Sequence, residues 1–176
     1  MRSVTMAVAA VLLAAGSASA QQKASGANPA AAGIGNVHEM VKRYVIGAAE
    51  LVPEERYSYQ PTKDVRTFGQ LVAHIVDAQN NLCSSAKGSA TPYSDATEKS
   101  VTKKADLLVK LRESFAACDA VYGSTTDAAL ANRAEIFGSA GSVAQALSFN
   151  AAHNWEHYGN MATYMRMMGI VPPSSR

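Results

Sequence analysis

Four helix-start signals, each followed by a stop signal, constrain this 176-residue chain more than any other feature of its sequence. Each start pairs a capping side chain with Glu or Gln three residues later, so that the cap accepts a backbone N–H and the longer side chain reaches back. The pairs are Asn36 with Glu39, Thr67 with Gln70, Asp95 with Glu98, and Ser142 with Gln145. The stops are Pro53, Gly88, Gly123 and Gly169. These signals predict helices over residues 37–51, 68–87, 96–122 and 143–168.

The spacing of apolar residues agrees with these helices. In the second helix, Leu71, Ile75, Ala78 and Leu82 recur at intervals of four, three and four residues, which is the period of one buried helix face. No segment of useful length alternates apolar and polar residues as a half-buried strand does. The sequence therefore predicts an all-α fold, a four-helix bundle.

Residues 1–20 have the pattern of a secretory signal peptide. Arg2 gives a basic start, residues 6–15 (MAVAAVLLAA) form an apolar stretch too short to span a bilayer, and residues 18–20 (Ala-Ser-Ala) match the small-residue cleavage pattern. The alternative is an uncleaved anchor or a core helix. We expect cleavage, because the residues that follow are poor in groups that could pack.

Cleavage between Ala20 and Gln21 would leave 156 of the 176 residues, a length that suits one domain with one core. We expect a flexible N-terminal segment over residues 21–35 and a helical bundle over 36–173. The protein would then be periplasmic or secreted, and no later segment has enough uninterrupted apolar residues to hold it in a membrane.

Two of the four histidines, His153 and His157, lie four residues apart within the predicted last helix. They are separated by about 40° around the helix axis, with Cβ atoms roughly 5–6 Å apart, so both imidazoles can reach one ion. His74 lies on the apolar stripe of the second helix and therefore points inward. Three neutral imidazoles with one open position are typical of a catalytic or ligand-exchanging metal site.

Simpler interpretations of the histidines remain open on spacing alone. A pair four residues apart on a helix also arises by chance, and a lone inward histidine such as His74 suits a hydrogen-bonded core position. His38 has no partner at metal spacing, and we interpret it as a surface or capping histidine. The segment from His153 to His157 (H-x-x-E-H) is also the inverted zincin signature, but such a protease needs a larger domain and a distant carboxylate ligand.

The flanking residues narrow these alternatives. After His157 come Tyr158-Gly159-Asn160, then Tyr164-Met165-Arg166, then Gly169-Ile170-Val171-Pro172. This run resembles the last helix of the DinB-like superfamily of helical-bundle proteins, in which H-x-x-x-H precedes x-G-Q, Y-x-R and G-x-x-P. Residues 68–75 (FGQLVAHI) resemble the same family's second helix, in which an apolar stretch leads into a metal-binding histidine. The resemblance covers residues 36–173.

The resemblance implies an up-down-down-up bundle with a divalent metal, zinc or nickel, held between helices by His74, His153 and His157. It also implies that such an ion can activate a low-molecular-weight thiol for transfer or isomerisation. The sequence departs from the family at Asn160, where glutamine is common. Asn160 could support a ligand or could face solvent.

The implied topology also bears on Cys83 and Cys118, the two cysteines of the chain. In an up-down-down-up bundle the second and third helices run parallel, so these residues lie at the same end. The eight residues 88–95 could span roughly 27 Å if extended, enough to carry the chain back. Because an oxidising compartment favours pairing, we predict a disulfide; two buried free thiols are the alternative.

Two functions remain open. The first is a metal-dependent transferase or hydrolase, in which the ion activates a thiol or water; the second is a non-catalytic metal-dependent ligand-binding protein. An enzyme should carry a general acid or base near the ion, and by spacing only Glu156 and Tyr158 qualify. Export weakens the thiol-transferase version, since the usual thiol cofactors are cytosolic.

The expected partner is a small-molecule ligand or substrate, and a homodimer is the protein assembly to consider. The chain carries 16 basic and 14 acidic residues, a formal charge of +2. The basic residues are scattered and form no stripe, which argues against nucleic acid as a partner.

Overall fold

The computed structural model describes residues 27–176, so the predicted signal peptide lies outside the described residues. Four long helices form the bundle: α1 (Pro29–Leu51), α2 (Phe68–Ala86), α4 (Lys104–Ser124) and α5 (Val143–Met167). The smaller elements are α3 (Ala96–Ser100), β1 (Arg133–Ile136), β2 (Ser139–Ser142) and the 3-10 turns η1 (Glu54–Arg56), η2 (Ala128–Ala131) and η3 (Pro173–Ser175). Over these residues, no helix combines the length and apolar character needed to cross a membrane.

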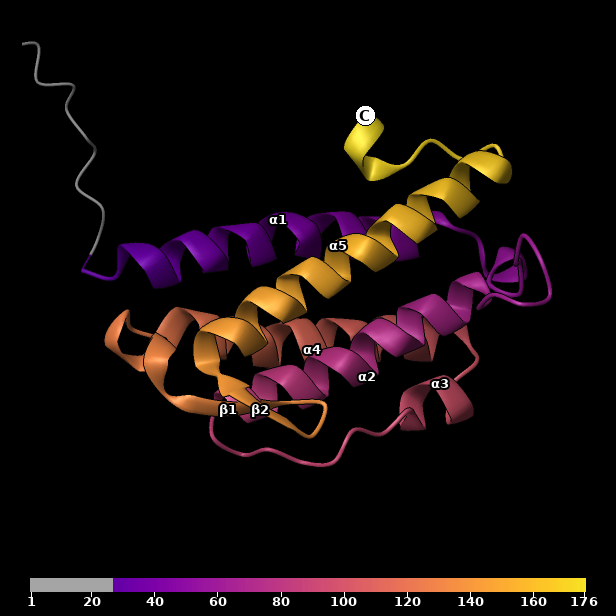
Figure 1. Ribbon diagram of the computed structural model, residues 1–176. Coiled ribbons are helices and arrows are strands. Elements are labelled where there is room, and N and C mark those ends of the chain that lie inside the picture. The colour runs from indigo at the N-terminus through magenta and orange to yellow at the C-terminus, as the bar shows by residue number, and fades with distance from the viewer. Residues whose placement is uncertain (1–26) are drawn as a thin grey trace, which may run out of the picture.

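The order of the four long helices is up-down-down-up, as expected (Figure 1). Helices α2 and α4 run parallel, because Gln79 is hydrogen-bonded to Ser114 and, further along both helices, Cys83 is bonded to Cys118. The connection after α2 returns along the outside of the bundle to α3 (Figure 1), the path that a parallel pair requires.

Two of the predicted helix starts are confirmed in detail. Thr67 and Gln70 form a capping box at the start of α2, and Ser142 and Gln145 form one at the start of α5. Each cap contributes about 1 kcal/mol to helix stability. Both helices end within one residue of the predicted position, so local side-chain chemistry determines the two helices that carry the candidate ligands.

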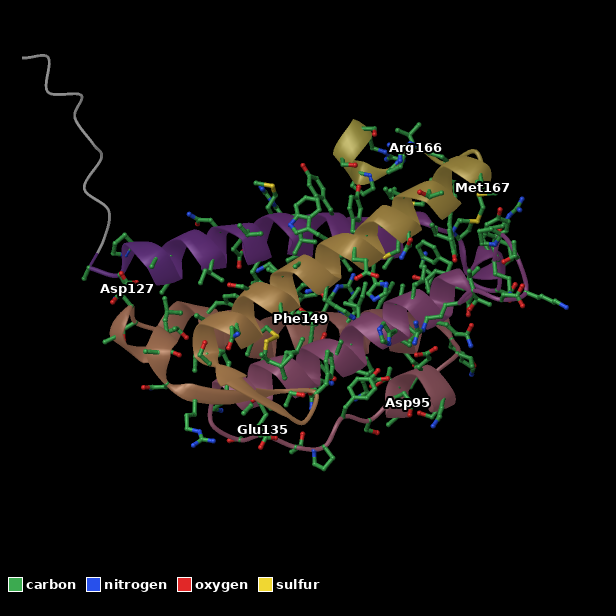
Figure 2. All side chains as sticks on the ribbon, in the orientation of Figure 1. Asp95, Asp127, Glu135, Phe149, Arg166 and Met167 are labelled. Carbon is green, nitrogen blue, oxygen red and sulfur yellow. A yellow bond between two sulfur atoms is a disulfide. The ribbon has the colours of Figure 1, made fainter. Side chains whose placement is uncertain are left out.

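The prediction for the start of the first helix was wrong. Helix α1 begins at Pro29, so part of the segment expected to be flexible, residues 21–35, is helical, and Asn36 lies inside the helix. The carboxylate of Asp127 accepts hydrogen bonds from the backbone N–H groups of Ala30 and Ala31, and Figure 2 shows Asp127 beside the start of α1. This capping carboxylate comes from far along the chain, whereas Pro29 at the first helical position is a local start signal that the predicted boundary at residue 37 overlooked.

The predicted third helix, residues 96–122, is divided into α3 and α4. Asp95 precedes α3 but makes no capping hydrogen bond with its side chain. Instead, the carboxylate of Asp77 on α2 accepts hydrogen bonds from the backbone N–H groups of Thr97 and Glu98 at 3.0 and 2.9 Å. The predicted cap pair was therefore wrong, and α3 is anchored to the middle of α2.

Two of the predicted glycine stops hold. Gly88 and Gly169 follow α2 and α5 with φ of 84° and 77°, the left-handed conformation that ends helices. Gly123 was wrongly predicted as a stop, since it lies within α4, which continues to Ser124.

A short hairpin, β1 and β2, precedes α5, although the sequence pattern predicts no strand. Its two-residue turn, Phe137 and Gly138, has φ of 48° and 83°, the signs of a type I′ turn. The strands, RAEI and SAGS, bury only Ala134 and so lack the apolar alternation that would have revealed them. The backbone N–H of Glu135 donates to Oγ of Ser85, which ties the hairpin to α2.

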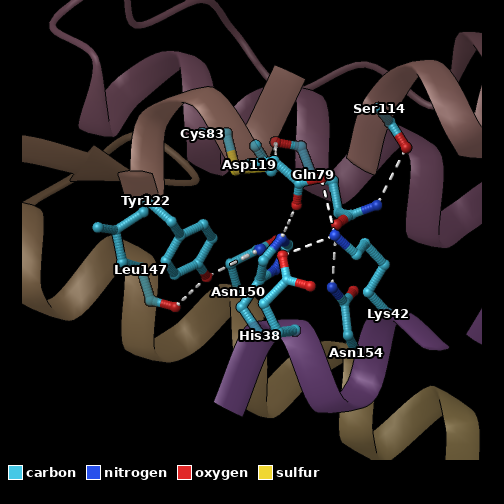
Figure 3. A network of polar contacts seen from close by, with 12 residues as sticks. His38, Lys42, Gln79, Cys83, Ser114, Asp119, Tyr122, Leu147, Asn150 and Asn154 are labelled. Carbon is cyan, nitrogen blue, oxygen red and sulfur yellow. Dashed lines mark hydrogen bonds and ion pairs between the residues drawn. A yellow bond between two sulfur atoms is a disulfide. The ribbon is translucent and has the colours of Figure 1, made fainter. Parts of the chain in front are cut away.

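A polar network crosses the core beside the disulfide (Figure 3). The amide nitrogen of Asn154 donates to Oε1 of Gln79, whose own amide nitrogen donates to Oγ of Ser114. All three residues are buried. Since a buried polar group costs free energy unless it is paired, this chain of hydrogen bonds fixes the relative register of α5, α2 and α4. The Cys83–Cys118 disulfide, present as predicted, joins α2 to α4 at the same end.

His38 is a core residue, and its interpretation as a surface or capping histidine was wrong. Its side chain is fully buried in α1, with Nε2 2.8 Å from a carboxylate oxygen of Asp119. The ring stacks on Tyr122 with centroids 4.0 Å apart. Nζ of Lys42 donates to the other oxygen of Asp119 at 2.8 Å (Figure 3). The hydrogen bond from His38 and the ion pair of Lys42 with Asp119 therefore join α1 to α4.

Candidate metal centre

The antiparallel packing of α2 against α5 brings His74, His153 and His157 together. Nε2 of His153 lies 3.2 Å from Nε2 of His74 and 3.1 Å from Nε2 of His157. Three nitrogens bound tetrahedrally to zinc at about 2.0–2.1 Å would be about 3.3 Å apart. The donor set and its spacing therefore fit one divalent ion, with a further coordination position left for a ligand.

The environment keeps these imidazoles neutral, which is the form that binds metal. Burial is the main cause and lowers the pKa of all three histidines; it brings the pKa of His153 and His157 to about 4. The neighbouring imidazoles and the positive charge of Arg66 lower the pKa of these two residues further. At neutral pH, an ion would not compete with protons for these nitrogens.

Glu98 and Tyr93 lie behind His74, and sequence reasoning assigned neither to the site. A carboxylate oxygen of Glu98 is 3.5 Å from Nδ1 of His74, and the hydroxyl of Tyr93 is 3.2 Å from the same nitrogen. An outer partner of this kind orients a ligating imidazole and raises its basicity. Among residues 27–176, Nδ1 of His153 and Nδ1 of His157 have no hydrogen-bond partner, so this outer support falls on His74.

Two further residues hold Glu98 in place. Asp77, three residues after His74 on α2, caps α3 and so fixes the backbone of Glu98. The guanidinium of Arg66 donates to the Glu98 carboxylate at 2.9 Å. The sequence did contain a signal for this arrangement, since Asp77 is a carboxylate on a buried helix face one turn from a predicted ligand. This signal was overlooked because Glu98 was paired with Asp95 as a helix-start signal.

A pocket of about 740 Å³ opens beside His157. Its wall is formed by the loop before α2, by the first turn of α2, by α3 and by α5, and it includes Arg66, Glu98, Glu156 and Asn160. The sequence left open whether Asn160 supports a ligand or faces solvent. In the structure, Asn160 is exposed and lines this pocket.

Of the two predicted acid–base candidates, only Glu156 borders the pocket. Tyr158 is buried, and its hydroxyl donates to Oγ of Ser174 at 2.7 Å, near the C-terminus. Tyr158 therefore packs on the other side of α5, where its ring stacks on Tyr44, and takes no part in the site.

The comparisons with known proteins agree with this architecture. A sequence profile of the DinB superfamily matches residues 38–161, and the chain therefore belongs to the DinB superfamily. This superfamily is metal-binding in general. Over residues 27–176, two groups of side chains could hold an ion: the histidine triad, and His38 with Glu39 and Asp119.

Two crystal structures of DinB-like proteins share the fold. The protein from Bacillus cereus ATCC 10987 has a TM-score of 0.69 and 20% sequence identity, covering 81% of this chain and 95% of that one. The DinB-like protein YjoA from Bacillus subtilis has a TM-score of 0.63 and 21% identity, covering 78% of this chain and 92% of that one. No curated protein sequence matches the chain.

Proposed function

We propose that this protein is an exported metal-dependent enzyme, a transferase or hydrolase that works at the centre formed by His74, His153 and His157. The convergence of three imidazoles supports this proposal most directly: His153 and His157 are buried, His74 is half-buried, and Nε2 of His153 lies within 3.2 Å of Nε2 of each of the other two. An ion bound there would supply Lewis acidity and lower the pKa of a coordinated water or thiol.

The pocket favours an enzyme over a non-catalytic binding protein. Glu156 precedes the ligand His157 and lines the pocket with an exposed side chain, so it can take a proton from a nucleophile or give one to a leaving group. Glu98 is held by Arg66 and faces His74, which suits it to orienting that ligand. A metal-dependent binding protein would also need Glu98 to support His74, but it would not need an acid or base at the position of Glu156.

Zinc or nickel is the metal that we propose. Imidazole nitrogen is a good ligand for both ions, and three imidazoles with an open position form a ligand-exchanging site. We further propose that the protein is periplasmic or secreted. The pattern of residues 1–20 supports this proposal, and the Cys83–Cys118 disulfide is compatible with an oxidising compartment.

Metal analysis of the purified protein tests the centre. We expect about one divalent ion per chain, lost in His157→Gln and retained in His38→Gln. The second variant removes a buried imidazole from the other group of possible ligands, so loss of the ion there would assign the metal to His38, Glu39 and Asp119. Equal metal content in the wild type and His157→Gln would refute the site. N-terminal sequencing of the exported protein should begin at Gln21; an uncleaved N-terminus would refute the signal peptide.

Glu156→Gln separates an enzyme from a binding protein. The loaded wild type and this variant are assayed with a thiol plus an electrophile, and separately with activated esters. The variant should keep its metal and lose turnover by about 100-fold or more, the contribution typical of a general base. A wild type that holds metal but turns over none of these substrates would favour the binding protein.

A further inference from the structure

Three aromatic side chains from three separate elements meet beside the triad. They are Tyr93 from the connection between α2 and α3, Phe137 from the hairpin turn and Phe149 from α5, and we call them the aromatic wall. The ring of Phe137 packs edge-on against the other two, with centroid distances of 5.2 Å to Tyr93 and 5.8 Å to Phe149. All three remain 38–44% exposed, so they form a surface and not a buried core.

The aromatic wall is continuous with the candidate ligands. The ring of Phe149 stacks on His153 at 6.1 Å, and the ring of Phe137 lies 6.5 Å from the same imidazole. The hydroxyl of Tyr93 contacts Nδ1 of His74. Phe149 lies on the side of α5 that faces the hairpin (Figure 2). A small molecule held at the triad would therefore lie next to the aromatic wall.

The conformation of Phe137 shows that the hairpin alone does not favour this residue. With φ of 48°, Phe137 occupies the first central position of a type I′ turn, where Asn, Asp and Gly are preferred. A bulky side chain is rarely left-handed, and such strain clusters at functional sites. Because the ring is 39% exposed, burial does not offset much of this strain. Asparagine would serve the turn better, whereas phenylalanine places a ring next to His153.

The triad thus has two unlike flanks. The pocket beside His157 is lined mainly by charged and polar residues, and none of the wall residues borders it. The other flank is aromatic. We propose that the aromatic wall is a subsite for a flat apolar group, an aromatic ring above all, of a small molecule whose polar end lies at the histidine triad. This inference rests on the proposed function insofar as an ion receives the polar end.

Two hydroxamates that differ in one substituent, a phenyl ring in place of a methyl group, test the subsite. Benzohydroxamate and acetohydroxamate share the metal-binding head, and their affinities for the zinc-loaded protein are measured by calorimetry. We expect the wild type to prefer benzohydroxamate by about 10-fold, the size of one aromatic contact. Phe137→Asn, which suits the turn, should reduce that preference to threefold or less and leave the affinity for acetohydroxamate unchanged.

The control is Met40→Ala, a change of an exposed apolar residue on α1, which should keep the full preference. Equal affinities of the wild type for the two hydroxamates would overturn the subsite, as would a preference that survives in Phe137→Asn.

A metal-free arm separates the two proposals. The apo protein is titrated with benzyl alcohol and followed by amide NMR. Shifts concentrated at Phe137 and Phe149, in a protein that binds neither zinc nor hydroxamate, would refute the metal centre and support the subsite. The absence of shifts at these two residues would overturn the subsite whatever the metal result.

Discussion

The carboxylate of Glu98 lies 3.5 Å from Nδ1 of His74, although 24 positions separate the two residues in the sequence. The contact exists because the chain returns along the outside of α2 after leaving it. Asn81 and Asp77 hold that return, since Asn81 donates to the carbonyl of Thr91 and Asp77 caps α3. One face of α2 therefore carries a candidate ligand and also positions the carboxylate behind it.

Replacing Glu98 with glutamine should weaken metal binding. The amide removes the negative charge that orients and polarises His74, and loss of such an outer partner typically costs about 10-fold to 100-fold in affinity. Competition with a chromophoric chelator measures the dissociation constant. Glu113→Gln, which removes an exposed carboxylate paired with Lys110 on α4, should leave it unchanged. An unaltered affinity in Glu98→Gln would show that the contact is incidental.

Asp77→Ala should lower both stability and metal affinity. It removes the two hydrogen bonds that hold the start of α3, a loss of about 1–2 kcal/mol, and it releases the backbone of Glu98. Urea unfolding of the metal-free protein and a metal titration measure the two effects. Asp95→Ala is the control, because Asp95 stands at the N-cap position without a capping hydrogen bond. If only stability falls, Asp77 has no part in positioning Glu98.

Loss of the disulfide should destabilise the bundle substantially. The bond joins residues 35 positions apart. Closing a loop of that length lowers the entropy of the unfolded chain, and this raises the free energy of unfolding by about 3–4 kcal/mol. Guanidinium unfolding of the double variant Cys83→Ala, Cys118→Ala should show this decrease. Wild type unfolded in the presence of reductant should lose a similar amount. Two alkylatable thiols in the native exported protein would contradict the bond itself.

The metal-free protein should lose stability as the pH falls below 6.5. Burial holds the pKa of His153 and His157 at about 4 in the folded state, whereas both would have a pKa of about 6.5 when unfolded. Below pH 6.5 the unfolded chain therefore binds more protons, which lowers the free energy of unfolding by about 2 kcal/mol per histidine at pH 5.

Urea unfolding between pH 7 and pH 5 measures this effect, and His153→Gln should reduce the slope. Burial also lowers the pKa of His38 and His74. All four histidines therefore lower the free energy of unfolding of the wild type as the pH falls. Stability that does not change over this interval would contradict burial of neutral imidazoles.

Resemblance to a family predicted that the three histidines bind one metal ion, and local spacing predicted which way each of them faces. The interval between His153 and His157 placed both on one helix face, and the apolar stripe around His74 turned it inward. The contacts that support His74 were not predictable, because Glu98 and Tyr93 reach it only through the returning connection. The aromatic wall was missed for a different reason, since Phe137 lies in the turn of a hairpin whose strands show no apolar alternation.

The sequence by itself determined the features that depend on groups three or four residues apart. These are the capping boxes at Thr67 and Ser142, the extents of α2 and α5, and the face shared by His153 and His157. Tertiary structure alone decided which carboxylate caps α1, since Asp127 lies far along the chain, and where α3 is anchored, since its cap is Asp77. The physical reason is that a hydrogen bond or ring contact needs atoms within a few ångströms. Between distant segments, only the packing of the whole bundle supplies that proximity.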